Sequence, residues 1–88
     1  MLTMIEFQGR SCPGFICETC NLQIKDADKA IVTWDEPGEP LLFFHKGSCD
    51  SRSHLYWHEL STFMVWLNEN TAFDRAEAKS RARALEQI

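Results

Sequence analysis

The chain has 88 residues, of which 44 % are hydrophobic and 25 % are charged, and this composition fits one globular domain. Its formal net charge of −4 excludes the broadly basic surface of a general nucleic-acid-binding protein. No apolar run approaches the roughly 20 residues of a membrane helix, and the start MLTMIEFQGR does not resemble a signal peptide. We therefore expect a cytoplasmic protein with no membrane span. The short chain without linkers is typical of a bacterial or phage protein.

The first half of the sequence predicts short strands joined by turns. Residues 4–8 alternate weakly and indicate a strand, whereas residues 9–14 contain two glycines, a serine and a proline and indicate a loop. Residues 30–34 are rich in β-formers, residues 35–40 contain a Pro-Gly turn signal, and residues 41–44 are apolar. We predict that residues 30–34 and 41–44 form an antiparallel hairpin.

Two pairs of potential metal ligands flank this hairpin. Cys17 and Cys20 are separated by two residues, and His45 and Cys49 by three. Cysteines in a cytoplasmic protein favour metal ligation over disulfides, and thiolates with one imidazole are the donors that tetrahedral zinc selects. Asn21 follows the first pair and tolerates the positive φ that such a knuckle requires. A redox C-x-x-C pair is the alternative, although no βαβ pattern surrounds it.

The order of knuckle, hairpin and second ligand pair at the start of a helix resembles a treble-clef zinc finger. The run from Cys17 to Cys49, with Ile24 after the knuckle and Phe44 before His45, resembles the first zinc module of LIM-type domains. The resemblance implies one structural zinc ion per chain, held by Cys17, Cys20, His45 and Cys49. LIM modules usually place two residues between the His and the Cys and carry a second zinc module; this chain has three residues there and lacks a second full ligand set.

Three further side chains, those of Cys12, His54 and His58, are weaker candidates for metal binding. Cys12 is predicted to be a loop thiol near the site, with ligation as the alternative. His54 and His58 are four residues apart and would share a helix face, a spacing that can bind metal; we expect surface or hydrogen-bonded histidines instead. His54, His58 and Asn68 only loosely resemble the arrangement of a treble-clef nuclease.

The second half of the sequence predicts two helices. Apolar residues at 56, 60, 63, 64 and 67 follow helical spacing and indicate a helix over 54–68. Residues 72–88 are rich in Ala, Arg, Glu and Lys and indicate a polar helix, capped near Thr71 and either packed on the domain of residues 1–70 or partly free. Four residues of the first helix are expected either in the core or at a partner surface: Tyr56, Trp57, Phe63 and Trp66.

These patterns together predict an α+β domain that consists of a zinc-bound hairpin, an aromatic helix and a polar C-terminal helix. A zinc ion with four protein ligands has no open position for substrate, so we expect a non-enzymatic protein-interaction module that binds a protein partner or a second copy of itself. A small nucleic-acid-binding regulator is the alternative, because the tail carries the basic residues Arg75, Lys79, Arg81 and Arg83. The third and least favoured hypothesis is that the protein is a metal-dependent nuclease.

Overall fold

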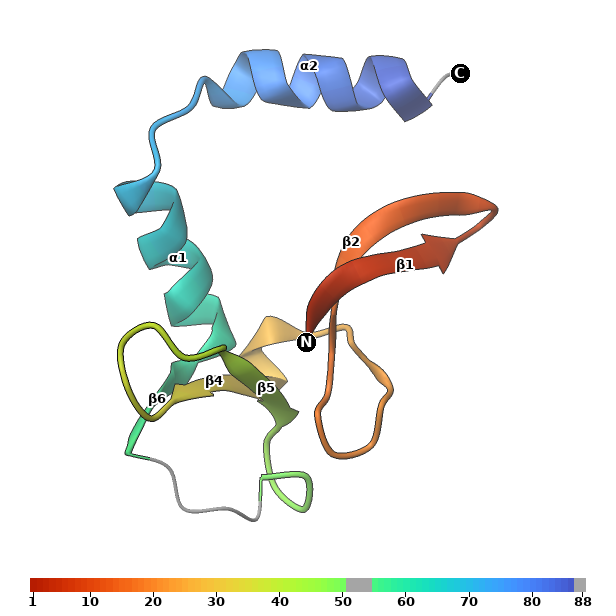
Figure 1. Cartoon of the computed structure of the whole chain (residues 1–88). Coiled ribbons are helices and arrows are strands. Elements are labelled where there is room, and N and C mark those ends of the chain that lie inside the picture. The colour runs from red at the N-terminus through yellow and green to blue at the C-terminus, as the bar shows by residue number, and fades with distance from the viewer. Residues whose placement is uncertain (51–54, 87–88) are drawn as a thin grey trace.

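The computed structural model of the chain describes residues 1–50 and 55–86, and its architecture is α+β as predicted (Figure 1). The N-terminal sheet has the strand order β1-β2-β3, and the central sheet has the order β5-β4-β6. The strands are β1 (Leu2–Phe7), β2 (Arg10–Ile16), β3 (Gln23–Ile24), β4 (Ala30–Trp34), β5 (Leu42–His45) and β6 (Tyr56–Glu59). The helices are a short 3₁₀ turn (Ala27–Lys29), α1 (Leu60–Asn70) and α2 (Arg75–Glu86).

The predicted hairpin is confirmed as β4 and β5, which pair antiparallel with Val32 opposite Phe43. β4 is the buried centre of its sheet, as expected for a strand rich in β-branched residues. The connecting turn contains Pro37 followed by Gly38 at φ 90°, and the Glu39 amide donates to the Glu36 carbonyl at 3.2 Å. Proline before a glycine with positive φ is the signature of a type II turn.

The prediction of a helix over 54–68 is wrong at its N-terminal end. Residues 56–59 form strand β6, which pairs antiparallel with β4 and places Tyr56 opposite Trp34. Helix α1 begins only at Leu60. Aromatic side chains such as those of residues 56 and 57 are also favoured in half-exposed strands. The edge of β4 offers backbone hydrogen-bond partners to residues 56–59, and the spacing of apolar residues within the segment gives no sign of this pairing.

The prediction of a loop over 9–14 is also wrong, because residues 10–16 form strand β2 opposite β1. The reversal occurs at Gln8 and Gly9, both with positive φ (52° and 77°), as in tight hairpin turns. Pro13 is tolerated within β2 because β3 pairs only with the Phe15–Ile16 end, so that Pro13 has an open side where no donor is needed.

The hydrophobic core is small and lies where the two sheets meet the start of α1. Val32 and Phe43 come from the central sheet, Ile24 from the N-terminal sheet and Leu60 from the first turn of α1. Cys17 belongs to the same cluster and is fully buried. Since a short chain buries a limited core, a bound metal at Cys17 would add a cross-link at the centre of the packing.

The two helices differ in how much of them is covered. The first turn of α1 packs on the core, and Phe63 lies against Phe43 with ring centroids 6.4 Å apart; from Met64 onward the side chains of α1 are exposed. Helix α2 stands apart from both sheets in Figure 1, and its side chains from residue 75 to 84 are exposed. None of the described helices is long and apolar enough to cross a membrane.

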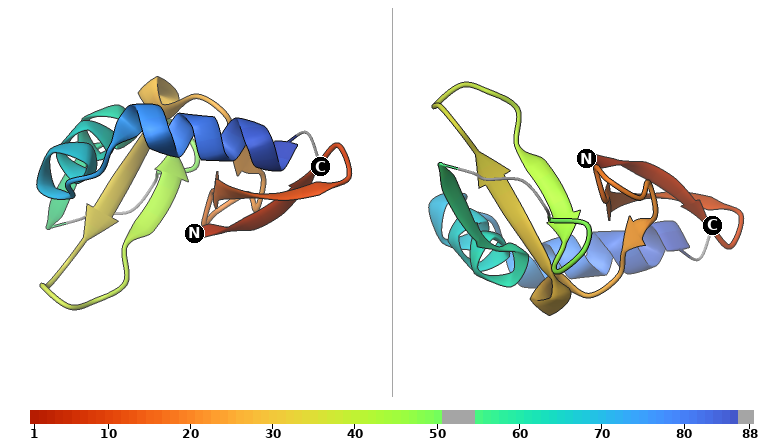
Figure 2. Two further views of the ribbon diagram at one scale, coloured as in Figure 1. Left: turned by 90° about the horizontal axis from the view of Figure 1, so that it is seen from above. Right: turned by 90° about the horizontal axis from the view of Figure 1, so that it is seen from below.

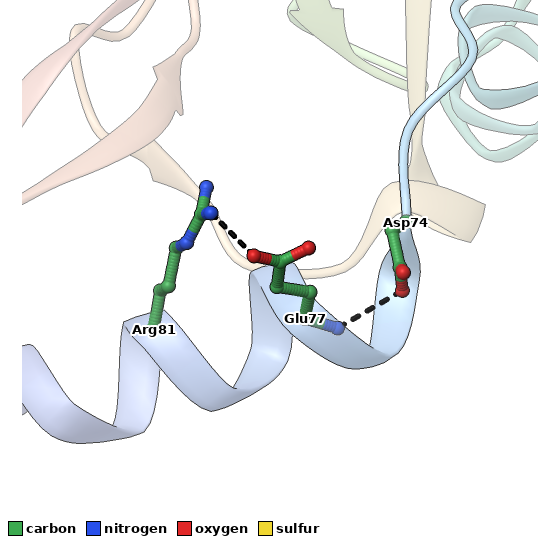
Figure 3. A network of polar contacts seen from close by, with 3 residues as sticks. All are labelled: Asp74, Glu77 and Arg81. Atoms are coloured by element: carbon green, nitrogen blue, oxygen red, sulfur yellow. Dashed lines mark hydrogen bonds and ion pairs between the residues drawn. The ribbon is translucent and has the colours of Figure 1, made fainter.

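The N-terminal cap of the second helix lies three residues after the predicted position, at residue 74 in place of residue 71. Asp74, rather than Thr71, accepts a hydrogen bond from the Glu77 amide at 3.0 Å, and Glu77 then forms an ion pair with Arg81 one turn later (Figure 3). An Asp at the cap with a Glu three residues later is a normal helix start.

Candidate metal centre

The first ligand pair lies on a tight knuckle between β2 and β3. The Asn21 amide donates to the Cys17 carbonyl at 3.0 Å, and the Cys17 amide donates to the Leu22 carbonyl at 2.9 Å. Asn21 has φ 60°, which confirms the predicted left-handed position after the second cysteine. Asparagine is one of the few non-glycine residues that adopt this conformation at low cost, and the knuckle therefore turns both cysteine side chains toward one point.

The second ligand pair spans the end of β5 and the turn that follows it, and no helix begins within the described residues 46–50. His45 is the last residue of β5, Cys49 follows in a turn, and the Asp50 amide donates to the Gly47 carbonyl at 3.0 Å. Gly47 has φ 89°, a conformation that glycine adopts without a steric penalty. The expected helix-borne ligand pair is therefore corrected: α1 begins at Leu60, after strand β6.

The four predicted ligands converge in space. The ligand atoms of Cys17, Cys20, His45 and Cys49 all lie within 4.8 Å of one another. Zn–S bonds of about 2.3 Å and Zn–N bonds of about 2.0–2.1 Å in a tetrahedron place a nitrogen and a sulfur about 3.5 Å apart. The Cys20 Sγ and the His45 Nδ1 are 3.4 Å apart, so the observed spacing fits a tetrahedral metal site.

The electrostatics of the site are those of a cluster that favours a cation. Burial opposes ionisation of the Cys17 thiol, but hydrogen bonds from the backbone of Cys20, His45 and Thr19 and from the His45 side chain outweigh it and lower the Cys17 pKa from 9.0 to about 6. Burial, together with hydrogen bonding and charge repulsion from the other two thiols, raises the Cys49 pKa to about 11. The raised Cys49 pKa opposes its ionisation in the folded cluster, whereas a divalent cation favours the thiolate form of its ligands.

Backbone and side-chain hydrogen bonds connect the two halves of the site. The Thr19 Oγ1 donates to the Cys49 carbonyl at 2.7 Å, and the Glu18 amide donates to the Phe43 carbonyl at 2.8 Å. The knuckle is thereby attached to both the second ligand pair and β5. The sequence does not single out Thr19, because its partner is thirty residues away and threonine at that position has no special local signature.

Two further candidates, Cys12 and His58, lie outside the four-ligand cluster. Cys12 is on strand β2 opposite Ile5 and is a partly buried free thiol, not a loop residue as predicted. His58 is on strand β6, between the rings of Trp34 (centroids 5.7 Å apart) and Trp66 (4.5 Å). The prediction that His54 shares a helix face with His58 falls partly on residue 54, which lies outside the described residues; His58 itself is in a strand.

The four residues predicted for the core or a partner surface differ in their exposure. The residues Tyr56, Trp57 and Trp66 are 53 %, 55 % and 43 % exposed, although the Tyr56 ring stacks on that of Trp34 with centroids 5.9 Å apart. Phe63 is partly buried against the core. The aromatic segment therefore has one residue that supports the core and three that are open to solvent.

No protein-family description, curated protein sequence or solved structure that was compared with the chain matches it.

Proposed function

We propose that this protein is a non-enzymatic interaction module whose fold is held by one structural zinc ion. The observation that carries the proposal is the convergence of three thiols and one imidazole, from two distant parts of the chain, within 4.8 Å. Structural zinc is held by four such ligands, whereas catalytic zinc keeps one position for water or substrate. A complete Cys₃His set leaves no such position.

Zinc is the metal that best fits the donors. Thiolate and imidazole are soft or intermediate ligands, and a tetrahedral arrangement of sulfur with one nitrogen is typical of zinc. The gain in stability from a structural zinc in a small peptide is about 10–16 kcal/mol at neutral pH, comparable to the whole stability of an ordinary domain. With a core this small, we expect zinc binding and folding to be coupled.

The exposed aromatic surface supports the interaction part of the proposal. Tyr56 and Trp66 are large side chains at least two-fifths exposed, and they are connected through ring contacts of Trp34 and His58; tryptophan and tyrosine are the side chains most often found as interface anchors. Monomeric proteins rarely leave large connected apolar areas uncovered. We expect this surface to bind a protein, including a second copy of the chain.

Binding of nucleic acid is the second candidate, favoured by one observation. Arg75, Lys79 and Arg83 lie four residues apart on exposed helix α2 and form a basic stripe that could contact phosphates. Mixed DNA or RNA at low salt is the test. Binding that weakens steeply as salt is added would support this candidate, and no detectable binding at low salt would reject it.

Zinc removal and light scattering test the interaction module together. With zinc bound, we expect a folded protein whose mass rises above that of one chain as the concentration increases from about 10 µM to about 500 µM. After removal of zinc by a chelator, circular dichroism should show loss of the sheets, and association through the folded surface should stop. An unchanged fold without zinc would refute the structural role of the metal, and a strict monomer would remove self-association from the proposal.

A further inference from the structure

A groove between the β4–β5 turn and helix α1 has a distinct chemical character. It encloses about 360 Å³. Its apolar walls include Trp34, Phe63 and Trp66, and the exposed turn contributes Glu36 and Glu39. An apolar groove with aromatic walls and two carboxylates at one side is suited to a partner that is basic and partly apolar.

Helix α2 of the same chain has the complementary chemistry. Glu77 and Arg81 are paired with each other on one side of the helix (Figure 3). Arg75, Lys79 and Arg83 recur every four residues and so form a stripe on a different side, where they have no ion-pair partner among the described residues. The charges of this stripe are opposite to those of the turn beside the groove.

Helix α2 also needs a partner on general grounds. It has 12 residues, and isolated helices shorter than about 12–15 residues are marginal in water. Its described side chains, those of residues 75–84, are exposed, and none of them belongs to the core. Packing on another surface is the usual source of stability for a helix of this length.

The position of α2 points to another copy of the chain as that surface. Asn70, at the end of α1, lines the groove, and α2 begins at Arg75, so α2 would have to fold back along α1 to enter its own groove; instead it runs away from α1 at a wide angle (Figure 1). In Figure 2 the β4–β5 turn projects at one edge of the molecule, whereas α2 runs from α1 across the molecule toward the N-terminal hairpin. The groove of a second copy requires no such reversal.

We propose that two copies of the chain exchange their α2 helices, each helix binding in the groove of the other copy. This inference rests on the proposed function as an interaction module and names both the partner and the surface. Arg75, Lys79 and Arg83 would lie along Glu36 and Glu39 of the other copy, with their stems against the tryptophan walls. The exchange is two-fold symmetric, so every contact is made twice, as in most homodimers.

Charge reversal on each side of the contact tests the exchange. The groove variant carries Glu36→Lys and Glu39→Lys, and the helix variant carries Arg75→Glu, Lys79→Glu and Arg83→Glu. In light scattering at low ionic strength, we expect each variant alone to have a dimer dissociation constant at least tenfold above that of the unchanged chain. An equimolar mixture should form a heterodimer, because each lysine-bearing groove then meets a glutamate-bearing helix and each unchanged groove meets an unchanged helix.

The mixture separates exchange between copies from packing within one copy. Packing of α2 in its own groove predicts that the mixed variants do not associate, and that outcome would overturn the proposal. The matched control is Glu6→Lys with Asp28→Lys, two exposed carboxylates outside the groove with the same change in net charge as the groove variant. This control should remain as dimeric as the unchanged chain.

Two measurements keep the test decisive if a variant misfolds. Zinc content and circular dichroism of every variant show whether the domain is intact; variants with full zinc that fail to form the heterodimer reject the exchange but leave the zinc module standing. For the unchanged chain, raising the salt from about 50 mM to about 500 mM should weaken the dimer at least threefold, since exposed charge pairs are screened. A dimer indifferent to salt, or no dimer, would contradict the proposal.

Discussion

At the scale of single residues, the contact between the Cys20 Sγ and the His45 Nδ1 at 3.4 Å joins the two ligand pairs. We predict that Cys20→Ser and His45→Ala each release the metal, because a thiolate or an imidazole is lost from a four-ligand set. Elemental analysis and circular dichroism should show loss of zinc and of the sheets. Cys12→Ser, which removes the thiol outside the cluster, is the matched control and should retain both.

The thiol pKa values predict how metal binding depends on pH. In the folded arrangement, before a metal binds, the Cys17 pKa is about 6 and the Cys49 pKa about 11, so in that arrangement at pH 7.5 Cys17 is mainly a thiolate and Cys49 still holds its proton. Zinc binding should therefore release at least one proton, from Cys49, and its affinity should fall steeply below pH 6, where Cys17 also becomes protonated. Calorimetry in buffers of different ionisation enthalpy measures this release, and an affinity unchanged between pH 7.5 and pH 5.5 would contradict it.

The lowered pKa of Cys17 and the raised pKa of Cys49 have opposite consequences for the stability of the fold before a metal binds. Cys17, lowered from 9.0 to about 6, contributes stability that is present above pH 9 and lost as the pH falls through 6. Cys49, raised from 9.0 to about 11, contributes stability that is present below pH 9 and lost as the pH rises through 11. Thiolate formation at Cys17 thus prepares the site for a cation at neutral pH.

The backbone conformation of Asn21 (φ 60°) allows a third test. Asn21→Ala should lower the free energy of unfolding by about 1 kcal/mol, because alanine is disfavoured in the left-handed region. Asn21→Gly should leave it nearly unchanged, because glycine adopts this region freely. Chemical denaturation of the zinc-bound protein measures the difference; equal effects of the two substitutions would show that the knuckle does not depend on this conformation.

At the scale of secondary-structure elements, the sequence predicted those elements whose conformation is determined by residues close to them in the chain. The β4–β5 hairpin was predictable because Pro37 and Gly38 define its turn and β-branched residues precede it. Strand β6 was not predictable, because its apolar residues continue the helical spacing of α1. Residues 56–59 are extended only because they pair with the distant strand β4. Strand β2 was missed because glycine and proline normally indicate loops, and Pro13 is tolerated only where β3 does not reach.

The junction between β6 and α1 depends on one side chain. Leu60 is the first residue of α1, and its side chain is completely buried in the core. Leu60→Ala should lower the free energy of unfolding by about 2–5 kcal/mol, because it removes buried methyl groups and leaves a cavity. Met64→Ala, at an exposed position of the same helix, should cost less than about 1 kcal/mol. Equal losses in urea denaturation of the zinc-bound variants would show that the core does not extend to α1.

At the scale of the whole molecule, the cluster of four potential metal ligands lies where the two sheets meet. The convergence of Cys17, Cys20, His45 and Cys49 was predictable from the sequence, because the spacing of each pair is a local property that the fold preserves. The local structure that carries His45 and Cys49 was not predictable. The turn around Gly47 and the hydrogen bond from Thr19 to Cys49 depend on contacts between residues distant in sequence. The buried Cys17 side chain belongs to both the metal cluster and the hydrophobic core, so we expect loss of the metal to disrupt the packing of the entire domain.

The most direct test of this account is X-ray absorption at the zinc edge on protein purified without added metal. We predict one zinc ion per chain, with three sulfur ligands at about 2.3 Å and one nitrogen ligand at about 2.0–2.1 Å. Protein that folds without a stoichiometric metal ion, or a zinc ion with oxygen ligands or fewer than three sulfurs, would contradict the proposed Cys17, Cys20, His45 and Cys49 centre.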